Sequence, residues 1–225
     1  MPKTTPRSHF VGNLWIAHML YEMGCVLFGD FTMGRSTEHS PIYINPRPLV
    51  SNPRAMRRIA RILHEEILTR MKKARPEVHP FQVVAGVPFG GLHLATVYSL
   101  RANTPLVYVP LKHEDPERRS QVEGRFKLGQ TCLIIDDLMT TGGSILETAK
   151  VLEDTGLIVK DAVVLIDRDQ GGRGRLKEHG YRVVSILNLK IMLNYYMANH
   201  LITENWYRKS IEYLDTHRHG VRDEA

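Results

Sequence analysis

The chain has 225 residues, of which 43% are hydrophobic and 24% charged, a composition typical of globular proteins. This length suits one parallel α/β unit, so we expect a single domain over residues 1–225. The net charge of +6 is compatible with nucleic acid or with small polyanionic substrates. Because the basic residues usually stand beside acidic ones and no nucleic-acid-binding motif occurs, we expect no nucleic-acid partner.

Several other classes of protein are disfavoured by the sequence. No apolar run approaches the roughly 18 residues needed to cross a bilayer, so we expect no membrane partner. The segment after Met1 lacks the apolar stretch of a secretory signal, which favours a cytoplasmic location. Cys25 and Cys132 lie far apart without metal-ligand spacing, so we interpret both as small buried hydrophobic residues.

The first part of the chain has no long hydrophobic period. Glycines and prolines interrupt residues 10–50, which favours a short helix plus a loop or small strands, packed as a hood over the main domain. Asn52-Pro53 is typical of a helix start, and apolar residues recur at helical spacing from Met56 to Met71. This pattern predicts an amphipathic helix of about five turns.

From residue 83 onwards, apolar runs alternate with helical patterns. The alternation indicates βαβ units, that is, a parallel sheet flanked by helices in an α/β fold with a core over about residues 52–190. Residues 190–215 are predicted to be mainly helical. The expected strands are Val83–Val87, Leu106–Val109, Thr131–Ile135, Ala162–Ile166 and Val183–Leu187, and the expected helices between them are Leu92–Leu100, Ser144–Leu152 and Arg173–His179.

The helix expected at Ser144 has its own boundary signals. Ser144 and Glu147 have the spacing of a capping box, in which each side chain satisfies a free backbone N–H group. Gly156 is predicted to end the helix in a left-handed conformation.

An acidic pair, Asp136 and Asp137, follows the strand expected at Thr131–Ile135. In an open parallel sheet, ligands collect at the carboxyl ends of the strands. Two carboxylates suit a sugar diol, or a Mg²⁺ ion that bridges it, and they can stabilise positive charge developing on a ribose. A strand end with acidic caps is the simpler alternative.

A glycine-rich turn follows the acidic pair. It combines hydroxyl groups with glycines whose backbone N–H groups can approach an anion, next to the positive end of a helix. These features predict a monophosphate site, and a phosphorylated ribose satisfies the turn and the carboxylates together. The residues concerned are Thr140, Thr141, Gly142, Gly143 and Ser144.

Two further loops also follow expected strands. The turn containing Pro88, Phe89 and Gly90 could receive a second anionic group at a helix N-terminus, or it could be a plain tight turn. The segment around Arg168 offers a planar guanidinium that suits a carboxylate. The alternative for Arg168 is an ion pair with Asp167 or Asp169 at the surface.

The loop at residues 133–144 resembles the PRPP signature of type I phosphoribosyltransferases, where PRPP is 5-phosphoribosyl-1-pyrophosphate. The surroundings, above all residues 86–95 and 129–172, resemble the orotate phosphoribosyltransferase family. The resemblance implies a five-stranded parallel sheet under an N-terminal hood, a homodimer, and transfer of the phosphoribosyl group of Mg²⁺-PRPP to orotate, with release of pyrophosphate.

The resemblance also implies roles for particular residues. Asp136 and Asp137 would face the ribose hydroxyls and hold Mg²⁺ indirectly, residues 140–144 would hold the 5′-phosphate, and residues 88–90 the pyrophosphate. Arg168, Arg35 and Tyr43 would bind the acceptor. Lys112 and His113 would act on pyrophosphate from the loop at residues 110–120.

This loop departs from the family pattern, because Glu114 stands where the family has its catalytic lysine and the basic residues of the loop are balanced by acidic ones. The family's lysine near the acceptor is also missing, with Arg35 nearby. Two alternatives to orotate transfer therefore stay open: a phosphoribosyltransferase for another acceptor, and a non-catalytic PRPP or nucleotide sensor.

Overall fold

The computed structural model describes residues 13–33, 37–110 and 121–217. Its main sheet has five parallel strands in the order β4-β3-β5-β6-β7, which confirms the predicted α/β fold. Each strand lies within a few residues of its predicted position. The strands are β3 (Val83–Gly86), β4 (Leu106–Tyr108), β5 (Thr131–Met139), β6 (Ile158–Asp167) and β7 (Arg182–Asn188).

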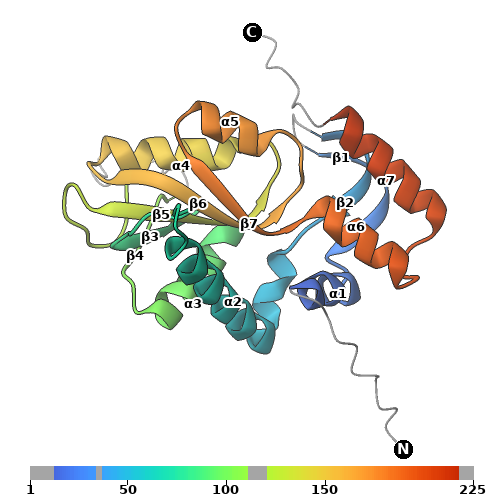
Figure 1. Cartoon of the computed structure of the whole chain (residues 1–225), viewed down its shortest axis with the longest axis horizontal. Helices are drawn as coiled ribbons and strands as arrows, with labels where there is room; N and C mark the ends of the chain where they lie inside the picture. Colours follow the sequence, from blue (N-terminus) through green and yellow to red (C-terminus); the bar gives the residue numbers. More distant parts are fainter. Residues whose placement is uncertain (1–12, 34–36, 111–120, 218–225) are drawn as a thin grey trace, which may run out of the picture.

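Helices cover both faces of this sheet (Figure 1). Along β5, Leu133 and Ile135 belong to one apolar core, whereas Cys132 and Ile134 belong to the other, because successive side chains of a strand point to opposite faces. The strand is therefore buried on both sides. One face carries α2 (Pro53–Met71) and α3 (Gly90–Ala102), and the other carries α4 (Gly143–Asp154) and α5 (Gly172–Glu178).

Helix α2 begins as predicted. The side chain of Asn52 accepts a hydrogen bond from the backbone N–H of Ala55 at 3.1 Å, and Pro53 is the first helical residue. The apolar stripe of the helix, including Met56 and Ile59, is buried. A local sequence signal thus correctly placed an element that joins the hood to the core.

The hood is built from both ends of the chain. Its N-terminal part is α1 (Leu14–Glu22) and an antiparallel pair of strands, β1 (Val26–Met33) and β2 (Thr37–Ile44), followed by a short 3₁₀ helix at Arg47–Ser51. The C-terminal helices α6 (Leu189–Ala198) and α7 (Glu204–Thr216) pack against these elements (Figure 1).

Specific contacts fix the C-terminal helices to the hood. The Tyr196 hydroxyl donates a hydrogen bond to the Ala17 carbonyl at 2.9 Å, and the rings of Phe28 and Trp206 lie 6.1 Å apart. The helical segment predicted at residues 190–215 therefore completes the hood rather than covering the main sheet.

Two smaller findings concern the cysteines and the helices. Cys25 and Cys132 are both buried as free thiols, as predicted, and burial raises the pKa of Cys132 to about 12. Within the described ranges, no helix has the length and apolar character needed to cross a membrane.

Candidate functional site

The acidic pair lies inside strand β5 rather than after it. The strand was predicted to end at Ile135, but it continues to Met139 because Asp136 and Met139 keep their pairing with Val164 and Asp167 of β6. Asp136 is 5% exposed, and its carboxylate accepts a hydrogen bond from the backbone N–H of Asp137 at 2.8 Å. Both carboxyl groups are thus held on the most central strand of the sheet, close to its carboxyl end.

The two carboxyl groups resist ionisation together. Burial, followed by repulsion from Asp137, raises the pKa of Asp136 well above its ordinary value. Burial also raises the pKa of Asp137, while the hydrogen bond with Asp136 and the positive charge of Arg47 act in the opposite direction. Such a pair favours a site where a cation or a developing positive charge offsets the repulsion.

The glycines at the start of α3 lie directly against these carboxylates. A Cβ atom at Gly90 would collide with the carboxylate of Asp137, and one at Gly91 would lie 2.8 Å from an oxygen of Asp136 and 2.6 Å from the carbonyl oxygen of Ile135. The loop of residues 87–90 and the acidic pair, which were singled out separately in the sequence, therefore form one surface.

We expect Gly91→Ala to destabilise the protein by about 1–3 kcal/mol, several degrees in Tm, because its new methyl group meets the backbone of β5. The affinity for PRPP, measured by calorimetry, should fall as well, because the new methyl group displaces Asp136. The matched control is Gly174→Ala on α5, where the added Cβ meets nothing within 4 Å and Tm should stay equal or rise. Equal behaviour of the two variants would contradict this packing.

The phosphate turn ends in an open helix N-terminus. Gly142 has a φ of 80° and is the residue at which α4 is capped, without any side-chain hydrogen bond. The predicted capping box of Ser144 and Glu147 is wrong, because the helix begins at Gly143 and Ser144 already lies within its first turn. The first backbone N–H groups of α4 are therefore not taken by a cap, as a phosphate site requires. Gly156, with a φ of 90°, follows the helix as predicted.

The third loop, at residues 167–172, closes against the phosphate turn. The backbone N–H of Arg168 donates a hydrogen bond to the Met139 carbonyl at 2.9 Å. A Cβ atom at Gly172 would lie 2.6 Å from the carbonyl oxygen of Thr140. Since Gly90 and Gly91 contact the other side of β5, all three predicted loops meet at the carboxyl end of this strand.

Arg168 is buried, with 2% of its surface exposed. Its Nη2 donates to the Ser40 hydroxyl at 3.3 Å and to the Ile42 carbonyl at 3.4 Å, both in β2 of the hood. The alternative of a surface ion pair with a neighbouring acid is wrong for Asp167, which pairs with Arg173 at 3.2 Å. Burial lowers the pKa of Arg168. A buried guanidinium whose described hydrogen bonds go to neutral oxygens is suited to an anionic ligand.

The remaining predicted residues are placed only in part. Tyr43 lies in β2 next to Ile42, and its ring packs on that of Phe31 with centroids 5.5 Å apart. Arg35, Lys112 and His113 lie outside the described residues, as does most of the loop at residues 110–120.

One charged residue near the site was missed from the sequence. Arg47, at the start of the 3₁₀ helix between hood and core, acts electrostatically on Asp137 and borders a small cavity with Gly90 and Asp137. The signal that could have identified it is weak, because a single exposed arginine in a proline-rich stretch has no motif of its own.

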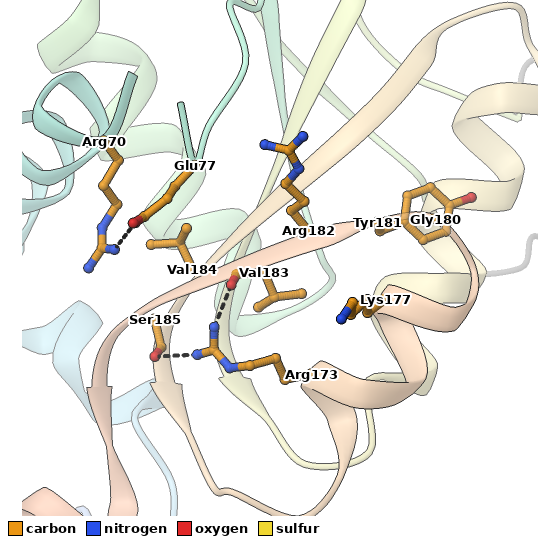
Figure 2. A pocket seen from close by; sticks show the side chains of 10 residues that line it. All are labelled: Arg70, Glu77, Arg173, Lys177, Gly180, Tyr181, Arg182, Val183, Val184 and Ser185. Atoms are coloured by element: carbon orange, nitrogen blue, oxygen red, sulfur yellow. Dashed lines mark hydrogen bonds and ion pairs between the residues drawn. The ribbon is translucent and has the colours of Figure 1, made fainter. Parts of the chain in front are cut away.

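A larger cavity of about 710 Å³ lies elsewhere, along the edge strand β7 (Figure 2). Arg173 spans it by donating to the Val183 carbonyl at 2.6 Å and to the Ser185 hydroxyl at 3.0 Å. The first bond occupies a backbone carbonyl of an edge strand, which discourages pairing with another chain. None of the predicted site residues lines this lateral pocket.

Comparison with known proteins places this geometry in a family. Residues 48–194 match a family model described as a phosphoribosyl transferase domain. The chain is 39% identical over 186 residues to an orotate phosphoribosyltransferase of Chlamydia felis, a match that covers 82% of each protein. The chain belongs to the orotate phosphoribosyltransferase family.

Solved structures of this family have the same fold. The orotate phosphoribosyltransferase of Aeropyrum pernix is 32% identical, with a TM-score of 0.68 over 80% of this chain and 97% of that one. The UMP synthase of Leishmania donovani is also 32% identical, with a TM-score of 0.79 over 92% of this chain. The chain spans 43% of that longer protein.

Proposed function

We propose that this protein transfers the phosphoribosyl group of PRPP to orotate, forming orotidine 5′-monophosphate and pyrophosphate in pyrimidine nucleotide synthesis. Its membership of a family whose relatives bear the name orotate phosphoribosyltransferase supports the reaction. Support for the acceptor comes from one observation on this chain, the buried guanidinium of Arg168 next to the phosphate turn.

Arg168 would distinguish orotate from uracil, because orotate has a carboxylate that the guanidinium can bind and uracil does not. Within the described ranges no acidic side chain pairs with Arg168, and a buried guanidinium without a negative partner is costly unless a ligand supplies the charge. Its backbone bond to Met139 and its side-chain bonds to β2 fix the guanidinium between the phosphate turn and the hood. An acceptor bound there would lie beside a ribose whose phosphate occupies the turn.

The reaction we infer is a displacement at ribose C1, in which the bond to pyrophosphate breaks as the bond to the pyrimidine nitrogen forms. Asp136 and Asp137 would support the positive charge that develops on the ribose. The first-turn N–H groups of α4, with the hydroxyls of Thr140 and Thr141, would hold the 5′-phosphate. The loop of residues 88–90 would receive the pyrophosphate at the N-terminus of α3, which also has no side-chain cap.

Mg²⁺ is the cofactor that the resemblance implies, and the residues present fit it. Asp136 and Asp137 offer hard carboxylate oxygens, and burial raises the pKa of both, so a cation beside them would favour their charged forms. The described part of the chain contains no cluster of three or more metal-binding side chains, so the other ligands would be PRPP oxygens and water. The ion would neutralise the departing pyrophosphate.

We also propose that the protein is a cytoplasmic homodimer, as the resemblance implies.

A substrate panel tests the proposed reaction. With Mg²⁺-PRPP, orotate absorbance should fall while one pyrophosphate is released for each orotate consumed, and uracil and purine bases should give no product. Turnover with another base alone would favour the second acceptor hypothesis. Calorimetric binding of PRPP without any turnover would favour the sensor hypothesis, which is motivated by the balanced charges of residues 110–120.

A further inference from the structure

The inward face of helix α7 carries two hydroxyl groups. Ser210 is 0% and Tyr213 8% exposed, and residues three apart on a helix lie on the same side. Helix α7 packs against β2, the strand that supplies Ser40 and Ile42 to Arg168. The C-terminal helix and the candidate acceptor-binding arginine therefore meet at the same hood strand.

Three buried polar atoms on Arg168 and on the inward side of α7 have no hydrogen-bonding partner among the described residues. They are the Tyr213 hydroxyl, the Ser210 Oγ and the Arg168 Nε. Tyr213 lies near enough to act electrostatically on the guanidinium of Arg168. A buried polar group without a partner destabilises the fold, so unpaired groups on Arg168 and on the helix packed against its hood strand indicate a ligand that pairs them.

The chemistry of these atoms selects the ligand. Arg168 uses Nη2 for β2, and its Nε–H is left without a partner among the described residues, so it can donate to an anion. A hydroxyl can donate a further hydrogen bond, and a carboxylate has about four lone-pair sites to receive such donors. A pyrimidine without a carboxylate would leave the same atoms unpaired.

We propose that Tyr213, with Ser210 one turn before it, belongs to the acceptor site and donates to the same acceptor carboxylate that Arg168 binds. The proposal rests on the proposed function and extends the acceptor site to α7. That helix lies outside residues 48–194, so the family match assigns it no role.

The test compares two nucleotides that differ in the carboxylate alone. Tyr213→Phe should raise the Kd for orotidine 5′-monophosphate, measured by calorimetry, about tenfold, the effect of losing one hydrogen bond to a charged group. The Kd for uridine 5′-monophosphate should stay within twofold. Tm should stay equal or rise, because the variant removes a buried hydroxyl that has no hydrogen-bonding partner among the described residues.

Tyr196→Phe is the matched control. Its hydroxyl donates to the Ala17 carbonyl and has no contact with Arg168 among the described interactions. This variant should lower Tm and leave both nucleotide affinities unchanged. Ser210→Ala provides a second test if Tyr213→Phe does not fold. This variant should also raise the Kd for orotidine 5′-monophosphate and leave the Kd for uridine 5′-monophosphate unchanged.

The outcomes separate the inference from the proposed function. A Kd for orotidine 5′-monophosphate within twofold of the wild type, or equal losses for both nucleotides, would overturn the role of Tyr213 while leaving orotate transfer intact. A wild-type protein that binds PRPP but neither consumes orotate nor prefers orotidine 5′-monophosphate would remove the acceptor assignment and this inference together.

Discussion

Replacing both Asp136 and Asp137 with asparagine is expected to weaken PRPP binding at least a hundredfold and to stabilise the protein at neutral pH. The loss of binding follows because the pair is the acidic group that faces the ribose and Mg²⁺ in the proposed site. The stabilisation follows because burial raises the pKa of both carboxyl groups, and repulsion from Asp137 raises that of Asp136 further. Calorimetry with Mg²⁺-PRPP and thermal unfolding measure the two effects.

The stabilisation expected for the double variant depends on pH. A carboxyl group with a raised folded-state pKa destabilises the fold once the pH exceeds its unfolded-state pKa, near 4, and the penalty grows until the folded-state pKa is passed. The gain in Tm for the double variant should therefore be clear at pH 7, at least about 2 °C for a domain of this size, and should shrink at pH 4.

The control for this experiment is Asp154→Asn, at the exposed end of α4. It removes a carboxylate of the same kind and should leave PRPP affinity unchanged. Undiminished PRPP affinity in the Asp136 and Asp137 double variant would show that the site is misplaced. A lower Tm at pH 7 would contradict the electrostatic account of the pair.

Arg168→Ala is expected to lower kcat/KM for orotate about a thousandfold, close to 4 kcal/mol of transition-state stabilisation. The guanidinium is buried, and it lies between the phosphate turn and the hood. PRPP affinity should stay within threefold, because the phosphate turn and the acidic pair remain. Steady-state kinetics and calorimetry separate the two substrates.

Two further variants sharpen this result. Arg168→Lys should recover little activity, since an ammonium group cannot reproduce the planar fork that binds a carboxylate. Arg182→Ala removes an arginine from the lateral pocket of Figure 2 and should leave kcat/KM unchanged. Equal losses in the Arg168 and Arg182 variants, or a parallel loss of PRPP affinity in Arg168→Ala, would contradict the assignment of Arg168 to the acceptor.

The parallel sheet and its loops were predictable because their signals are local. Apolar runs bounded by glycine and proline indicate strands, and the Asn52-Pro53 cap placed α2 correctly. The rule that ligands collect at the carboxyl ends of parallel strands predicted that the three loops meet. The contact of Arg168 with Met139 and the close approach of Gly90 and Gly91 to β5 confirm this.

Boundaries that depend on tertiary pairing were predicted less well. Strand β5 continues through Asp136 and Asp137 because β6 pairs with it as far as Met139, and polar side chains give no sign of this in the sequence. The capping box at Ser144 failed because Gly142, in its left-handed conformation, starts the helix earlier. In both places the functional residues break the usual local pattern.

Contacts between distant segments could not be predicted from the sequence. Arg168 is anchored by Ser40, which lies 128 residues away, and the inward hydroxyls of α7 come from the far end of the chain. Arg47 reaches Asp137 from the link between hood and core. No local period or motif encodes such pairings, because they depend on how the hood sits against the sheet.

A crystal structure of the protein with orotidine 5′-monophosphate would test the three-loop site most directly. We predict the 5′-phosphate at the Gly142 turn and the start of α4, the ribose hydroxyls facing Asp136 and Asp137, and the carboxylate on Arg168. Density for the nucleotide in the lateral pocket along β7, or a carboxylate bound away from Arg168, would contradict this account.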